Sequence, residues 1–129
     1  MQQQSPTVSL QSRGELTVVR LGGEIDVAVA GDLKNLFANL ADVGQLHLVV
    51  DLVDVTFMDS TGLGALLAAR KQMLSREGSV ALVSPPDAVQ EVLNLTGISA
   101  LFPTFESAQD AIGGELPIGP SSGRQLHTV

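Results

Sequence analysis

The sequence predicts one α/β domain: a mixed sheet of about five strands with an N-terminal hairpin and about four helices, mainly on one face. Two patterns support this prediction. Two short β-rich runs come first, separated by a glycine-containing loop at residues 13–15. After them, apolar runs of strand length alternate with segments whose apolar residues recur every three or four positions, which is typical of helices that connect parallel strands.

The chain length fits a single domain. At 129 residues there is enough chain for one core and too little for two full ones. We assign the domain to residues 1–113. Residues 114–129 are rich in Gly, Pro and Ser, so we predict a flexible C-terminal tail there.

The first half of the domain is predicted to contain a hairpin, a helix and a central strand. The hairpin pairs residues 8–12 with residues 16–21. Apolar residues then recur at helical spacing from Val29 to Ala41. The run Leu46–Val50 is apolar almost without alternation, as expected for a strand covered on both faces, and we place it at the centre of the sheet.

The second half is predicted to continue the alternation after an irregular link at residues 51–59. A leucine stripe marks the next helix, which we expect from Thr61 to Arg76. The remaining predicted elements are a strand at residues 79–83, a helix at 86–95, a short edge strand at 101–105 and a last helix that the capping pair Ser107 and Asp110 opens and that ends at Ile112.

The charge balance argues against nucleic acid and membrane partners. Fourteen acidic residues face seven basic ones, giving a formal net charge of -7. Such a charge repels phosphate backbones and anionic lipid. We therefore expect neither nucleic acid nor a membrane surface as a partner.

Several absences favour a soluble protein of the cytoplasm. The chain has no cysteine, which excludes disulfides, thiolate nucleophiles and the common structural zinc sites, and which fits a reducing compartment. The N-terminus carries neither a basic flank nor an apolar stretch of the secretory kind. No apolar run approaches the roughly 20 residues that span a bilayer. We expect cytoplasmic localisation, no metal and no cofactor.

Enzymatic activity is not predicted. A serine nucleophile needs a base, and the chain has neither a Gly-x-Ser-x-Gly elbow nor a suitably placed histidine. His47 falls inside the central strand and His127 in the tail. A Gly-Lys phosphate loop is also missing from the sequence.

Function is expected at the segment Asp59-Ser60-Thr61-Gly62-Leu63-Gly64, where a buried strand leads into a helix. Asp, Ser and Thr are all favoured N-cap residues, and the two glycines leave the first turn without bulky side chains. The start of this helix is therefore polar and open to a partner. Binding residues often lie at such junctions.

This segment resembles the phosphorylation loop of the STAS family, the domain shared by sulphate transporters and anti-sigma factor antagonists. Three other pieces match in the same order: Gly23-Glu24-Ile25-Asp26, Asp51-Leu52 and Leu95-Thr96-Gly97. The resemblance spans nearly the whole predicted domain. It implies a STAS-like fold and a regulatory role.

The resemblance further implies a switch at Ser60. In such antagonists, a partner that is both anti-sigma factor and ATP-dependent serine kinase modifies this serine, with ATP bound by the partner. The unphosphorylated form binds the partner and frees the sigma factor, and the phosphorylated form is released until a serine phosphatase resets it. The antagonist would act as a monomer or weak dimer.

A phosphate on Ser60 would add about -1.5 to -2 charges beside a positive helix end. We expect the first amides of the helix to satisfy its oxygens, so that recognition changes and the fold does not. The residues predicted to contact the partner are Asp26, Met58, Asp59, Thr61, Gly62, Gly64, Ala65 and Ala68. Within this set, Thr61, Ala65 and Ala68 are expected to project away from the leucine stripe.

Two alternatives stay open at this point. Asp26, Asp59 and Ser60 also suit plain helix caps or turns, which is the commonest role of such residues. A STAS domain can also serve as a subunit of a lipid or ion transporter, or as a scaffold in a stress-sensing assembly, and fold alone does not separate these roles.

Overall fold

The computed structural model describes residues 5–113 as a five-stranded sheet with helices packed against it. In chain order the elements are β1 (Thr7–Arg13), β2 (Leu16–Ile25), α1 (Val27–Asp42), β3 (His47–Met58), α2 (Ser60–Leu74), β4 (Ser79–Val83), α3 (Asp87–Leu95), the 3₁₀ helix η1 (Ile98–Leu101), β5 (Thr104–Phe105) and α4 (Ala108–Ile112). The predicted tail at residues 114–129 lies outside the described residues. Within those residues, no helix has both the length and the apolar character needed to cross a membrane.

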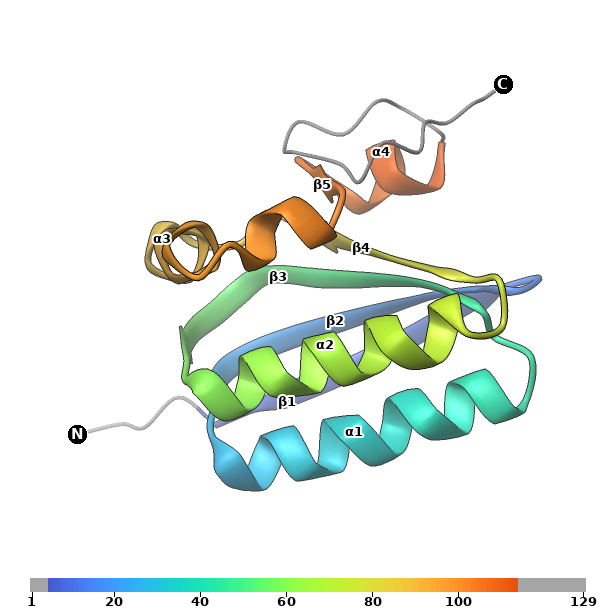
Figure 1. The fold of residues 1–129 in the computed structure, drawn as a ribbon, viewed down its shortest axis with the longest axis horizontal. Coiled ribbons are helices and arrows are strands. Elements are labelled where there is room, and N and C mark those ends of the chain that lie inside the picture. The colour runs from blue at the N-terminus through green and yellow to red at the C-terminus, as the bar shows by residue number, and fades with distance from the viewer. Residues whose placement is uncertain (1–4, 114–129) are drawn as a thin grey trace.

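The strands follow the order β1-β2-β3-β4-β5, so β3 is central (Figure 1). β1 runs antiparallel to β2, and the three other pairs are parallel. Gly14 has φ +62° in the turn between β1 and β2, a conformation that glycine adopts without steric cost. The predicted mixed sheet with its N-terminal hairpin is confirmed.

The main core lies between one face of the sheet and the helices α1, α2 and α3. Figure 1 shows α1 and α2 side by side. The largest fully buried side chains include Phe37, Leu52, Leu66, Leu93 and Phe102. A smaller cluster on the other face joins Val49, Val83 and Phe105 to the half-buried Ala111 of α4. The helices therefore cover mainly one face, as predicted, with α4 as the exception.

The predicted irregular link at residues 51–59 is wrong. β3 continues to Met58 because β2 extends to Ile25 and offers a partner along this length. The pairing is uneven, with register shifts between Arg20 and Gly22 and between Gly23 and Glu24. These irregularities break the alternation of side chains that would have marked the segment as a strand.

The predicted edge strand at residues 101–105 is shorter than expected. Only Thr104–Phe105 pairs with β4, and Ile98–Leu101 forms η1 instead. Gly97 precedes η1 with φ +78°, which ends α3 and turns the chain. The local apolar run did not reveal this turn of 3₁₀ helix.

Candidate functional site

The candidate site lies where the parallel strands β2 and β3 end and the helices α1 and α2 begin. Ile25 and Met58 are register partners at these strand ends, and the Asp59 N–H donates to the Ile25 carbonyl at 3.4 Å. An aspartate caps each helix: Asp26 caps α1 and Asp59 caps α2. Two positive helix N-termini therefore stand next to one another at the same edge of the sheet.

Asp59 holds the first turn of α2 in place. Its Oδ1 accepts hydrogen bonds from the amides of Thr61 at 2.9 Å and Gly62 at 3.2 Å, and from the Thr61 hydroxyl. The hydroxyl of Thr61 is the main cause that lowers the pKa of Asp59 below its usual 3.8. Desolvation by burial is the next largest cause and raises the pKa, and the amides of Gly62 and Thr61 lower it further. Asp59 is therefore an anion at neutral pH.

Asp26 plays the same part at α1 and is more open to solvent. Its Oδ1 accepts the Val29 amide at 3.2 Å, and its carbonyl accepts the Ala30 amide at 2.8 Å. The side chain is exposed. Both aspartates therefore cap their helices through Oδ1.

Ser60 is the first residue of α2 and is exposed. The amides of Thr61 and Gly62 already donate to Asp59, so in this state they are not free to hold a phosphate on Ser60. The expectation that the first amides of α2 satisfy the phosphate oxygens therefore stays a prediction, and it requires these two amides to turn away from Asp59. Because Ser60 is exposed and directly follows Asp59, a phosphate on it would place its charge next to the Asp59 carboxylate.

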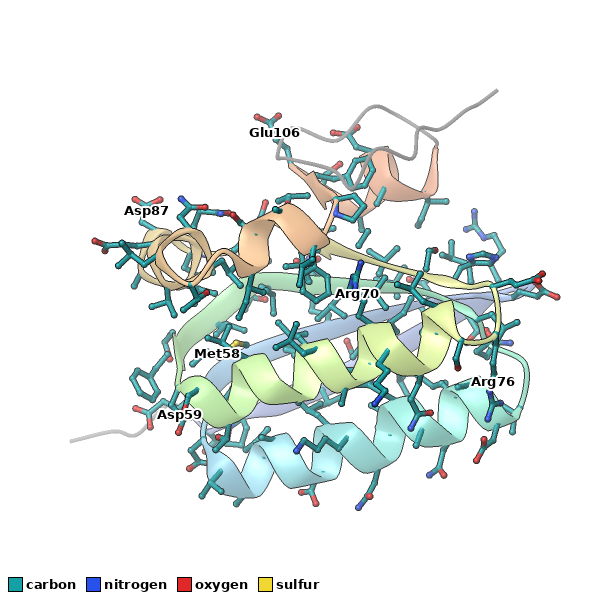
Figure 2. The ribbon with its side chains drawn as sticks, in the orientation of Figure 1. Met58, Asp59, Arg70, Arg76, Asp87 and Glu106 are labelled. Atoms are coloured by element: carbon teal, nitrogen blue, oxygen red, sulfur yellow. The ribbon has the colours of Figure 1, made fainter. Side chains whose placement is uncertain are left out.

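Three of the predicted contact residues are buried beneath this surface. Met58 is 8% exposed, Ala65 is fully buried, and Gly62 is buried against Met58. The expectation that Ala65 projects outward is wrong, because α2 packs against α1 as well as against the sheet and so buries a wider face than the leucine stripe. Figure 2 shows Met58 and Asp59 together at the N-terminal end of α2.

The outward surface near Ser60 combines predicted residues with two that the sequence reasoning missed. Thr61, Gly64 and Ala68 are half-buried. Phe57 at the end of β3 is 51% exposed, and Val27 at the start of α1 is 67% exposed. Phe57 is therefore exposed, whereas its neighbour Met58, which was predicted to contact the partner, is buried. The register of β2 against β3 shifts in this stretch, so simple alternation along the strand does not indicate which of the two faces outward.

A shallow groove runs between α1 and α2 beside Ala68. Its volume is about 260 Å³, and its lining includes Lys34, Phe37, Ala38, Ala68, Ala69 and Gln72. Three of the lining residues are alanines, whose short side chains leave this space open. The groove therefore extends the exposed surface from the N-terminus of α2 along the helix pair.

The opposite face of the sheet has a different character. The Arg20 Nε lies 3.3 Å from Oδ2 of the buried Asp51, whose Oδ1 accepts the Val53 amide at 3.1 Å. Two open cavities of about 430 and 290 Å³ share this pair on their walls. None of the predicted site residues lines them. The burial of Asp51 and its bonds to Arg20 and the Val53 amide favour a structural role for this residue.

Arg70 also takes a structural position. Its Nε donates to the Leu101 carbonyl at 3.0 Å and so ties α2 to η1. The sequence predicted that the guanidinium would reach water or a carboxylate, and the structure gives it a backbone carbonyl as its acceptor. Figure 2 shows Arg70 on the side of α2 that faces η1.

Comparison with known proteins points to one family. The model of the STAS domain matches residues 7–111. The anti-sigma-F factor antagonist RsfB of Mycobacterium tuberculosis is 28% identical over 110 residues, which cover 85% of this chain and 89% of that protein. The anti-sigma-B factor antagonist of Staphylococcus aureus is 26% identical over 91 residues, which cover 70% of this chain and 84% of that protein.

A solved structure gives the same result. The crystal structure of an anti-sigma factor antagonist from Mycobacterium paratuberculosis has a TM-score of 0.75 with this chain at 29% identity. The match covers 84% of this chain and 92% of that one. The similarity therefore extends over almost all of the described elements.

Proposed function

The chain belongs to the STAS domain family, and from that premise we propose that it is an anti-sigma factor antagonist switched by phosphorylation of Ser60. The unmodified protein binds an anti-sigma factor that is also a serine kinase, and the sigma factor is thereby released. Phosphate on Ser60 ends this binding, and a serine phosphatase restores it. The protein itself is a cytoplasmic binding module without catalysis of its own.

The observation that carries the proposal is the exposure of Ser60 at the start of a helix that is already capped. A kinase active site needs a hydroxyl that it can reach without unfolding its substrate. Ser60 meets this need, because Asp59 rather than Ser60 fixes the first turn of α2. The names of the relatives, antagonists of anti-sigma factors, support the same role.

The surface around Ser60 suits reversible protein binding. Phe57 and Val27 offer exposed apolar area, and Asp26 and Asp59 offer carboxylates on either side. Aromatic side chains at the centre of an interface commonly contribute much of its binding free energy. We therefore add Phe57 and Val27 to the partner surface, together with Asp26, Asp59, Thr61, Gly64 and Ala68, while Met58, Gly62 and Ala65 support it from below.

The switch follows from charge. The lowered pKa of Asp59 keeps its carboxylate ionised at neutral pH, and a phosphate would add about -1.5 to -2 charges directly beside it. In the unmodified protein the amides of Thr61 and Gly62 donate to Asp59, so the phosphate gains these two donors only when they leave that carboxylate. Burying the new charge unpaired in a complex costs several kcal/mol, and a loss of only about 1.4 kcal/mol weakens binding tenfold.

Phosphorylation by the cognate kinase tests the site. We expect incubation with ATP and that kinase to place one phosphate on the peptide that contains Ser60, detected by mass spectrometry, and Ser60→Ala to abolish it. Phosphate on another peptide would refute the site. No phosphate on any peptide would instead favour the alternative role as a transporter subunit or scaffold.

A matched pair of charge variants tests the switch. Ser60→Asp adds a carboxylate at the N-terminus of α2, and Ser75→Asp adds one at the exposed C-terminal end of the same helix. We expect calorimetry to give at least a tenfold loss of affinity for the kinase with Ser60→Asp and almost none with Ser75→Asp. The circular dichroism spectra should stay alike. Equal affinities for the two variants would contradict the charge mechanism.

A further inference from the structure

β1 forms an open edge of the sheet. The strand order gives it one neighbour, β2, and all seven of its residues are exposed. Its register with β2 runs without interruption from the pair Thr7–Gly22 to the pair Arg13–Leu16. The N–H and C=O groups on its outer side therefore form a regular row that no other described strand pairs with.

This edge lacks the devices that usually prevent pairing with another chain. Proteins protect edges with short strands, prolines, inward charges or bulges. The interior of β1 contains neither proline nor charge, and its one charged residue, Arg13, stands at the end. The opposite edge is different, because β5 has only two residues, Thr104 and Phe105, and both are buried.

Apolar side chains line the same edge. Val8 and Leu10 are 46% and 50% exposed, and they face the helix-covered side because their register partners are the buried Leu21 and Val19. Val8 and Leu10 therefore point to the same side of the sheet as the main core, but at this edge no helix covers them and they stay exposed.

Two apolar residues of α1 extend the exposed apolar surface that Val8 and Leu10 form. The groove lined by Lys34 and Ala38 shows which flank of α1 faces α2. Leu36 and Leu40 are half-buried and, by helical periodicity, lie on the other flank, toward β1. Figure 1 shows β1 and α1 at the end of the molecule opposite β5 and α4. We call the strip formed by Val8, Leu10, Leu36 and Leu40 the β1 seam.

We propose that the β1 edge pairs antiparallel with β1 of a second copy of this chain, joining the two sheets into one. The strand is complementary to itself. With Leu10 opposite Leu10 of the second copy, Val8 faces Ser12 and Arg13 faces Thr7, so no like charges stand opposite one another. The two-fold axis keeps the helices of both copies on the same side, and the two β1 seams meet.

The pairing is weak and depends on salt. A seven-residue strand with a narrow apolar seam buries less than the about 800 Å² per partner of a standard stable interface. A formal net charge of -7 on each copy also opposes association, and added salt screens this repulsion. Ser60 starts α2, on neither β1 nor the seam, so the pairing does not rest on the proposed switch.

Sedimentation equilibrium of the full chain tests the proposal. From about 10 µM to 1 mM protein we expect a rising fraction of dimer, larger at high salt than at low salt. Leu10→Lys should lower the association constant at least tenfold, because edge lysines block strand pairing. Val53→Lys is the matched control, since Val53 is 48% exposed on β3 away from the seam, and it should leave association unchanged.

Hydrogen exchange identifies the surface involved. We expect amides of residues 7–13 to gain protection at high protein concentration and not at low concentration. A chain that stays monomeric at 1 mM in high salt would overturn the proposal, as would a dimer that Leu10→Lys leaves intact. Protection of β1 that does not change with concentration would also overturn it, because another segment of the same chain would then occupy the edge.

Discussion

Replacing Gly62 and Gly64 by alanine, one at a time, tests how α2 supports the candidate site. The two glycines lie two residues apart in the first turns of the same helix. A Cβ built on Gly62 would stand 2.5 Å from Met58 Cγ and 3.2 Å from Ile25 Cγ2, while one built on Gly64 meets nothing within 4 Å. The same chemical change therefore has opposite consequences at the two positions.

The magnitudes follow from two competing contributions. Alanine is favoured over glycine in a helix by about 0.8–1 kcal/mol, so Gly64→Ala should stabilise the fold by roughly that amount. At Gly62 the same gain is outweighed, because Met58 is buried and must leave its rotamer, and overpacking of this kind costs about 1–3 kcal/mol. Gly62→Ala should therefore lower the free energy of unfolding by up to about 2 kcal/mol.

Urea unfolding monitored by circular dichroism compares the free energies of unfolding of the two variants. An unchanged slope m shows that both variants unfold like the parent protein. In thermal unfolding the two variants should differ by at least 4 °C, since about 1 kcal/mol corresponds to roughly 4–8 °C in a domain of this size. Gly64→Ala should also weaken binding of the kinase despite its higher stability, because it adds a methyl group on the partner surface. If Gly62→Ala proved as stable as Gly64→Ala, the close packing of α2 on Met58 would be refuted.

Two further predictions concern Asp59 and Phe57, which precede Ser60 in the chain. The folded-state pKa of Asp59 is lowered, so the stability that its carboxylate contributes should be complete above its unfolded value of about 3.8 and should be lost as the pH falls through the folded value. The difference in unfolding free energy between the parent protein and Asp59→Asn should thus stay constant from about pH 7 to pH 5 and shrink below about pH 3.8. Urea titrations at each pH measure this difference. A difference that grew as the pH fell would contradict the capping role of the Asp59 carboxylate. Phe57→Ser should weaken kinase binding at least tenfold while changing the stability by no more than about 0.5 kcal/mol, because Phe57 is half exposed. Val43→Ser, at the exposed far end of α1, should leave the affinity unchanged in the same calorimetric titration, and a loss with both variants would show that the effect is not local.

The sequence alone determined the hairpin, the order of strands and helices, and the position of Ser60 at the start of α2. These features have local causes. The turn at Gly14, the helical spacing of the apolar residues in α1 and the capping residues at Asp59 act within a few positions of the chain. Each of these features can be predicted without knowing which other helices or strands pack against the segment.

Only the tertiary structure decided which side chains near Ser60 face solvent. Ala65 looked exposed because the leucines define one stripe of α2, and it is buried because α1 packs on the adjacent flank. The choice between Phe57 and Met58 likewise depends on where the register of β3 shifts against β2. Burial is a property of what packs against a residue, and helical or strand periodicity gives direction along one element without saying how many sides of that element are covered.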